Sequence, residues 1–261
     1  MDKVPMDSIM GEQVGHIFQR NLEKNGVKFQ LSASVDKAVP STSDSKKVGA
    51  VHLKDGTVLD ADLVVLGVGV RPATDFLREN PALTLEKDGS IKTDEHFSVP
   101  GLNSDVFAIG DIATYPYHGP GTDPDTGTYT RIEHWNVAQN AGRSVARSIK
   151  HMLTSSTASL DRLKPKAFIP IFWSALGAQL RYCGNTPKGW DGLVLKGEPE
   201  NAKFVAFYCL GQTIVAVATM AMDPVMVKCA ELMRRGNMPS KADVEGGMDV
   251  LKIEVPKGMK I

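Results

Sequence analysis

The stretch Val106-Phe107-Ala108-Ile109-Gly110-Asp111-Ile112-Ala113 is the most specific feature of this sequence of 261 residues. Its first four residues are all apolar, which predicts a strand that is buried on both faces of a layered α/β sheet. Such a strand delivers Gly110 and Asp111 at its carboxyl end, where open α/β sheets bind their ligands. Gly110 permits close backbone approach, and the Asp111 carboxylate can accept hydrogen bonds from hydroxyl groups. An ordinary strand end followed by an Asp turn is the alternative interpretation.

A first α/β unit is predicted before this stretch. Apolar residues recur at helical spacing over residues 8–24 and predict an amphipathic helix. Strands are expected at residues 27–31 and 48–53, the second of which enters a hairpin turn. The segment Leu63-Val64-Val65-Leu66 is apolar at every position, so it predicts a further strand that is covered on both faces.

Two further units are predicted after it. An irregular insertion over residues 115–129 precedes a helix, which the spacing of apolar residues predicts over 133–153. From Phe168 onward the pattern changes to short strands, including 203–210 and 213–219, followed by a helix. This last part is typical of an α+β unit.

Composition narrows the classes of function. Thirty Lys and Arg balance thirty Asp and Glu, and this zero net charge gives no general reason to expect nucleic-acid or anionic-membrane binding. No apolar run reaches the ~18 to 20 residues of a membrane-spanning helix. A soluble intracellular protein, cytoplasmic or mitochondrial, is expected. Cys183, Cys209 and Cys229 are widely spaced, which predicts buried free thiols, and no metal site is expected.

The motifs resemble those of a known family. Residues 107–111 resemble the second flavin-binding motif of FAD- and NAD(P)-dependent pyridine-nucleotide oxidoreductases, and Gly67-Val68-Gly69-Val70-Arg71-Pro72 resembles the segment that precedes it. Other motifs are similar to the apoptosis-inducing factor-like and ferredoxin reductase-type members, in particular the branch that often carries a Rieske domain. These motifs lie at residues 131–135, 171–175, 180–182, 203–208, 214–218 and 222–224.

The resemblance implies a fold and a domain organisation. The fold would be a partial two-dinucleotide-binding-domain architecture, like that of glutathione reductase, followed by a C-terminal α+β domain. Residues 1–72 would be the C-terminal part of an NAD(P)H-binding domain, 73–153 that of an FAD-binding domain, and 166–255 the C-terminal domain. Complete members carry two G-x-G-x-x-G turns, and the sequence contains neither. The chain is therefore expected to be the C-terminal portion of an oxidoreductase and to bind FAD weakly or not at all.

The resemblance also implies residue roles. Asp111 would bond the flavin ribityl chain or the adjacent phosphate region, and Gly110 would give access. Glu133, His134 and Trp135 would lie beside the isoalloxazine edge at the start of a helix, and Trp173 near the nicotinamide and flavin. The alternatives are a surface or core histidine for His134 and a core residue for Trp173. Two further residues are candidates: Gly69 for cofactor binding, and Arg71 for either a nucleotide phosphate or a carboxylate.

The implied activity is electron transfer from NAD(P)H through FAD to a redox acceptor, such as an iron–sulfur protein or a quinone-like molecule. No residue is identified as catalytic. Disulfide reductase chemistry is disfavoured because the C-terminal unit lacks the His-Pro and Glu pattern of that group. The alternative function is a catalytically incompetent interaction module, built mainly on residues 168–255, that associates with a partner or with itself.

Overall fold

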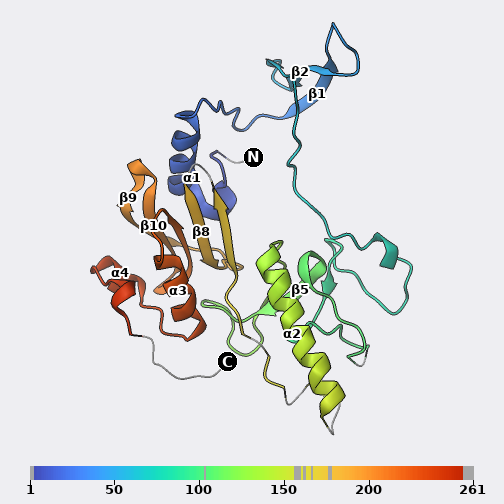
Figure 1. Ribbon diagram of the computed structural model, residues 1–261, viewed down its shortest axis with the longest axis vertical. Coiled ribbons are helices and arrows are strands. Elements are labelled where there is room, and N and C mark those ends of the chain that lie inside the picture. The colour runs from blue at the N-terminus through green and yellow to red at the C-terminus, as the bar shows by residue number, and fades with distance from the viewer. Residues whose placement is uncertain are drawn as a thin grey trace. The chain divides into compact units, whose positions relative to one another are not determined.

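The computed structural model describes residues 3–102, 104–155, 160, 163–165, 167–175 and 178–254. The chain divides into two compact units, Met1–Val70 and Arg71–Ile261. Figure 1 draws the whole chain, coloured from its N-terminus to its C-terminus. Residues 1, 166 and 255, which bound the predicted domains, lie outside the described residues. Within the described ranges, no helix is both long and apolar enough to cross a membrane.

The first unit combines one helix with a small antiparallel sheet. Helix α1 (Asp7–Glu23) confirms the predicted helix, with a kink at Gly11, where φ is 76°. The sheet has the order β1 (Val35–Pro40), β2 (Val48–Leu53) and β3 (Val58–Asp60). A tight turn between β2 and β3 confirms the predicted hairpin: Gly56 adopts a φ of 91° there.

Two strands predicted in this unit are not formed. Residues 27–31 and 63–66 belong to no strand, and the side chains of the second segment are exposed, Leu63 to 79% and Val65 to 83%. A strand that is covered on both faces needs neighbouring strands in its own sheet, and none of the described strands pairs with either segment. An uninterrupted apolar run indicates that a segment tends to be buried. Whether the segment forms a strand also depends on the presence of neighbouring strands with which it can pair.

The second unit starts with a small mixed sheet and a long helix. Strand β5 (Ala113–Tyr117) pairs in parallel with β4 (Ile91–Lys92) and antiparallel with β6 (Thr128–Thr130). The prediction of an irregular insertion over 115–129 is therefore partly wrong, because residues 115–117 at its start pair with residues 128–130 at its end. Helix α2 (Trp135–Thr154) confirms the predicted helix, and short 3-10 helices lie at Asp75–Leu77 and Gly110–Ile112.

The predicted buried strand at residues 106–109 is also wrong. The segment is extended, but only Phe107 makes an isolated bridge, to Ser98. Ala108 is 2% exposed, whereas Val106 and Ile109 are 38% and 40% exposed. The described residues form no strand that pairs along this segment, and its burial does not alternate between two faces: Val106 and Ala108 belong to the same face, but only Ala108 is buried. It still leads directly into Gly110 and Asp111, as predicted.

The start of helix α2 is fixed by a histidine. His134 is the N-cap: its extended backbone precedes the helix, and its Nδ1 accepts a hydrogen bond from the Asn136 backbone N–H at 3.2 Å. Only an unprotonated Nδ1 can accept this bond. Burial lowers the pKa of His134, and the negative charge of Asp111 opposes this effect. The neutral imidazole therefore stabilises the first turn of α2.

The C-terminal part is a five-stranded antiparallel sheet in the order β7-β8-β11-β10-β9. Strands β8, β9 and β10 of this sheet are labelled in Figure 1. Its strands are β7 (Ile171–Ala175), β8 (Gln179–Gly184), β9 (Gly192–Glu198), β10 (Lys203–Leu210) and β11 (Thr213–Met220). Strands β10 and β11 confirm the predicted pair. Three short helical elements follow or interrupt the strands, namely η4 (Pro199–Asn201), α4 (Lys241–Glu245) and η5 (Val250–Lys252).

Helix α3 (Val225–Arg234) packs against this sheet and completes its core. Leu232 and Met226 of the helix are 0% exposed and cluster with Phe207 and Val217 of the sheet. The central strands β10 and β11 are buried at nearly every position, which explains their uninterrupted apolar sequences. The three cysteines are free and buried, as predicted, and burial raises the pKa of the Cys229 thiol to about 12.

We expect Leu232→Ala to lower the free energy of unfolding by about 2–5 kcal/mol, because it leaves a cavity in this core. The matched control is Leu153→Ala, since Leu153 is 81% exposed in the last turn of α2 and its truncation should change stability by less than about 0.5 kcal/mol. Urea unfolding followed by circular dichroism measures both. Equal losses in the two variants would contradict the assigned core.

The His134 cap predicts a pH dependence. Because the folded state lowers the pKa of His134, the stability that this residue contributes is present above pH ~6.5 and decreases as the pH falls below that value. His134→Asn keeps a capping side chain and should remove this dependence. His134→Ala should remove the pH dependence as well, and should lower the free energy of unfolding at pH 7.5 by about 0.5–2 kcal/mol, because the cap is lost. Denaturant unfolding between pH 5 and 8 tests both variants, and an unchanged pH profile in His134→Asn would disprove the assignment.

Candidate functional site

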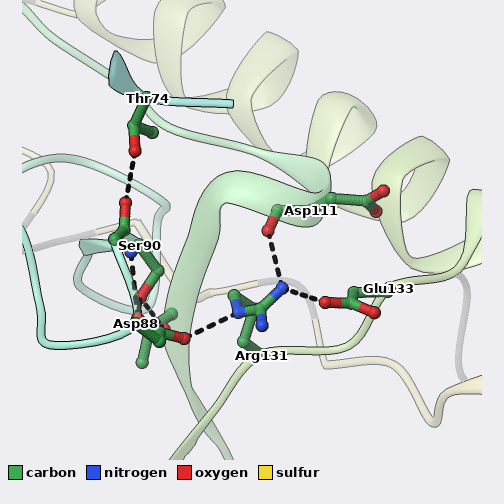
Figure 2. A network of polar contacts seen from close by, with 8 residues as sticks. Thr74, Asp88, Ser90, Asp111, Arg131 and Glu133 are labelled. Atoms are coloured by element: carbon green, nitrogen blue, oxygen red, sulfur yellow. Dashed lines mark hydrogen bonds and ion pairs between the residues drawn. The ribbon is translucent and has the colours of Figure 1, made fainter. Parts of the chain in front are cut away.

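The guanidinium of Arg131 joins three segments of the second unit at the start of α2 (Figure 2). Its Nε donates to Asp88 Oδ2 at 2.9 Å, and its Nη1 donates to the Asp111 carbonyl oxygen at 3.2 Å and to the Glu133 carboxylate. The Arg131 side chain is only 18% exposed. A largely buried cation needs such acceptors, so the guanidinium fixes the three segments relative to one another.

Asp88 is held in place by its own turn. The backbone N–H and hydroxyl of Ser90 donate to Asp88 Oδ1 at 2.9 and 2.7 Å. These bonds, with a smaller contribution from Arg131, lower the pKa of Asp88 to about 2. The Ser90 hydroxyl also contacts the Thr114 hydroxyl at 2.7 Å, and the Thr74 hydroxyl donates to the Gly89 carbonyl at 2.6 Å (Figure 2). The carboxylate that faces Arg131 is thus ionised at neutral pH.

Gly110 and Asp111 form a turn directly against α2. Gly110 has a φ of 71°, and a Cβ there would lie 3.4 Å from the Cβ of Ala138 on the helix. Glycine suits this position because the left-handed conformation is strained for other residues. Arg131 binds the carbonyl of Asp111, while the carboxylate of Asp111 is exposed. The turn therefore presents an exposed carboxylate on a backbone that the hydrogen bond from Arg131 holds in place.

Aromatic side chains from α2 and β7 meet beside this turn. The ring centroids of His134 and Trp135 lie 5.4 Å apart, and those of His134 and Phe172 lie 5.8 Å apart. The indoles of Trp135 and Trp173 are 5.5 Å apart and remain 50% and 43% exposed. We call these four residues the aromatic cluster. Half-exposed indoles that contact each other form an apolar surface suited to a planar ring.

Arg181 of β8 supports the outer part of the cluster. Its guanidinium carbon lies 5.9 Å from the ring centroid of Trp173, within the range of a cation–π contact. Asp223 accepts hydrogen bonds from Arg181 Nε and Nη2 at 3.3 and 3.2 Å. The carboxylate holds the guanidinium, and the guanidinium in turn restricts the indole.

Six of the seven predicted site residues gather at this place in the second unit. They are Gly110, Asp111, Glu133, His134, Trp135 and Trp173. The seventh, Gly69, belongs to the first unit, where it has a φ of 93°. Arg71 donates to Asp75 Oδ2 at 3.1 Å, so it pairs with a carboxylate. Trp173 is not a core residue, because it is 43% exposed.

Arg131 and Arg181 were missed as site residues. Arg131 stands within the motif of residues 131–135, and its spacing of two from Glu133 is typical of an exposed pair on a strand or loop. Its partner Asp88 is 43 residues away in the sequence. Similarly, Arg181 and Asp223 are separated by 42 residues. A single sequence offers no signal for pairs at such separations.

Comparisons with known proteins cover nearly the whole chain. Residues 2–142 match the family described as pyridine nucleotide-disulphide oxidoreductase, and residues 171–252 match the reductase C-terminal family. The chain is 32% identical over 248 residues to apoptosis-inducing factor 3 of Homo sapiens, which covers 94% of the chain and 37% of that protein. It is also 32% identical over 203 residues to monodehydroascorbate reductase 4, peroxisomal, of Arabidopsis thaliana, covering 78% of the chain and 37% of that protein.

Solved structures show the same fold. The putidaredoxin reductase in a covalent complex with putidaredoxin has a TM-score of 0.75 at 23% identity, covering 94% of this chain and 53% of that chain. A ferredoxin reductase from Rhodopseudomonas palustris has a TM-score of 0.74 at 21% identity, covering 91% and 53%. This likeness confirms the fold class expected from the sequence. The chain thus spans just over a third of the curated relatives quoted and about half of these structures, at 37% and 53%.

The motifs that predicted a family and the match over residues 2–142 agree. The chain belongs to the pyridine nucleotide-disulphide oxidoreductase family.

Proposed function

We propose that this chain supplies the flavin-facing and acceptor-side parts of an FAD-dependent NAD(P)H oxidoreductase. The observation that carries this proposal is the pair of exposed indoles, Trp135 and Trp173, beside the turn of Gly110 and Asp111. Within it, residues 1–72 act as the C-terminal part of an NAD(P)H-binding domain and residues 73–153 as that of an FAD-binding domain. Residues 166–255 form the C-terminal domain that brings Trp173 to the flavin.

The described residues fit an FAD molecule. The exposed Asp111 carboxylate would accept hydrogen bonds from the ribityl hydroxyls, and Gly110 adds no side chain that obstructs them. Trp135 and Trp173 offer the apolar surface for the isoalloxazine ring. In the first unit, Gly69 would allow close backbone approach by a nucleotide, since no described residue beyond its chain neighbours has an atom within 4 Å of the position of its missing Cβ.

The chain's own residues would orient the ring and exclude water from it. When bound, FAD supplies hydride acceptance from NAD(P)H and onward transfer of single electrons. The amino terminus of α2 carries a partial positive charge, which favours a negatively charged group beside Glu133 and His134. His134 is neutral in its capping state, so the positive potential at this point comes from the helix terminus and not from the imidazole. Arg131 acts as a positioning residue, since it holds the Asp111 backbone.

The proposed electron acceptor is an iron–sulfur protein. Two solved structures with this fold are reductases whose titles name putidaredoxin or ferredoxin. The half-exposed Trp173, next to the cation of Arg181, would lie between the flavin and such a partner. Electron transfer needs the two centres to approach closely, and an exposed edge of the site allows that.

We expect FAD to bind this chain weakly, because the sequence contains no G-x-G-x-x-G turn for the pyrophosphate. Fluorescence titration of the three tryptophans with FAD should show quenching of Trp135 and Trp173 and little quenching of Trp190. The double variant Trp135→Phe/Trp173→Phe retains only Trp190, so its residual signal should not respond to FAD. Absorption of the protein after gel filtration then shows how much flavin is retained.

Asp111→Asn should weaken binding of FAD and of riboflavin by about tenfold, because a charged acceptor is lost. Asp105→Asn is the matched control, because Asp105 is also exposed but lies at the other end of the 106–109 segment. This variant should bind FAD and riboflavin with unchanged affinity. Quenching that persists in the double tryptophan variant, or equal effects of the two Asp substitutions, would contradict the proposed site.

A specific observation also favours a second candidate function, which is assembly. The extended segment 63–68 exposes Leu63, Val65, Leu66 and Val68 to between 77% and 87%, and none of the described strands pairs with it. Contiguous exposed apolar residues on unpaired extended backbone favour association with another chain. We propose that this segment associates with a second copy when no other strand covers it.

Size-exclusion chromatography with light scattering should therefore give a mass above that of the monomer. Leu63→Lys/Val65→Lys should shift the mass to that of the monomer, because charges on an edge oppose pairing. The control Ile149→Lys/Leu153→Lys changes two exposed apolar residues on α2 and should leave the assembly intact. A monomeric wild-type chain would rule out this second function and leave the first unaffected.

A further inference from the structure

The backbone of residues 63–68 in the first unit is unpaired along both edges. None of the backbone hydrogen bonds in the described part of the chain involves these residues. Consecutive side chains of a strand point to opposite faces, and here Val65 and Leu66 are 83% and 77% exposed. An apolar segment of this kind is suited to the interior of a sheet. It would need a strand on each edge and a covering layer on each face.

The segment 106–109 of the second unit is paired along one edge only. Residues 97–99 bond to that edge through two backbone hydrogen bonds, with N···O distances of 2.9 and 3.0 Å. In this antiparallel pattern the N–H and C=O groups of Phe107 point to the opposite edge, where none of the described residues bonds to them. This segment can therefore accept one further strand.

The sequences of both segments indicate what kind of partner fits. Residues 63–70 and 106–109 contain no charged residue and no proline, and strands of parallel sheets have such uninterrupted apolar sequences. Parallel strands are joined by crossover connections, usually helices, which cover the faces of the sheet. A partner that buries these segments has to supply strands together with helices. The βαβ arrangement of dinucleotide-binding folds does so.

A second copy of this chain meets the requirement only in part. In a symmetric pair, the segment 63–68 of each copy would cover one edge of the other and leave the remaining edge free. Proteins that share the fold contain additional polypeptide, since this chain covers 53% of two solved reductases and 37% of apoptosis-inducing factor 3. A partner that resembles this additional polypeptide is therefore favoured over a second copy.

We propose that residues 63–68 and 106–109 are docking sites for a separate polypeptide with a βαβ dinucleotide-binding fold. Its strands occupy the free edges of the two segments, and its helices cover the apolar faces. Docking replaces the self-association of residues 63–68. One consequence rests on the proposed function: if the partner carries the G-x-G-x-x-G turn that this chain lacks, the complex should retain FAD.

The probe is the part of apoptosis-inducing factor 3 of Homo sapiens that this chain does not match, coexpressed as one polypeptide with the full chain. Size-exclusion chromatography with light scattering should give the mass of a one-to-one complex. Hydrogen exchange resolved by residue should be slowed about tenfold or more at every amide of residues 63–68. A second copy on one edge would slow only alternate amides, because successive N–H groups of a strand point to opposite edges.

Two pairs of variants test the docking sites. Val65→Lys and Ile109→Lys should each lower the amount of copurified partner by about tenfold or more, because each places a charge where the partner buries the segment. The matched controls are Val58→Lys and Val227→Lys, which change exposed apolar residues outside the two segments and should leave copurification unchanged. All four side chains are at least 40% exposed, so the variants should fold.

The exchange measurement has an internal control in residues 42–46, which lie in the turn between β1 and β2 and should exchange equally fast with and without the partner. The proposal is overturned if the light-scattering masses are only multiples of this chain. It is also overturned if the partner copurifies while residues 63–68 and 106–109 exchange as fast as in the chain alone. A protected one-to-one complex that retains no flavin supports the docking sites and argues against the proposed function instead.

Discussion

The pairing of the largely buried guanidinium of Arg131 is the constraint on which the site depends. Its acceptors come from the turn at Asp88, the turn at Asp111 and the segment that enters α2 at Glu133. Removing any of them would leave part of a desolvated cation unpaired, which is unfavourable. The same contacts hold the backbone carbonyl of Asp111 beside the segment that leads into α2. A single cation thus holds together the segments of the proposed cofactor surface.

The C-terminal sheet contributes the other half of that surface. Strand β7 brings Phe172 and Trp173 to the start of α2, where they meet His134 and Trp135. Tyr182 of β8 stacks on Phe172 at 5.0 Å, which anchors the cluster in the buried centre of the sheet. The position of Trp173 therefore depends on the packing of the whole sheet. Strands that come after α2 in the sequence therefore help to shape a site at the turn of Gly110 and Asp111, which precedes β5.

The apolar segments at 63–66 and 106–109 have sequences suited to a covered sheet, but side chains of both are exposed, namely Leu63, Val65 and Leu66 of the first and Val106 and Ile109 of the second. The solved structures that share the fold are about twice as long, since this chain covers 53% of two of them. Burial of both segments requires strands that the described residues do not provide. The contacts of Arg131 and the five strands of the C-terminal sheet, by contrast, all lie within the second unit. The two apolar segments thus have no strand partners among the described residues, whereas the strands of the C-terminal sheet pair with one another.

The sequence by itself determined the helix over 133–153, the β10–β11 pair and the motif at Gly110 and Asp111. These depend on the spacing of apolar residues and on turn residues close in sequence, which a single chain displays. The tertiary structure decided the contact between Trp135 and Trp173, the role of Arg131, and the exposure of Leu63 and Val65. Each depends on which distant segments pack together, and no local periodicity encodes that, because burial and ion pairing are properties of neighbours in space.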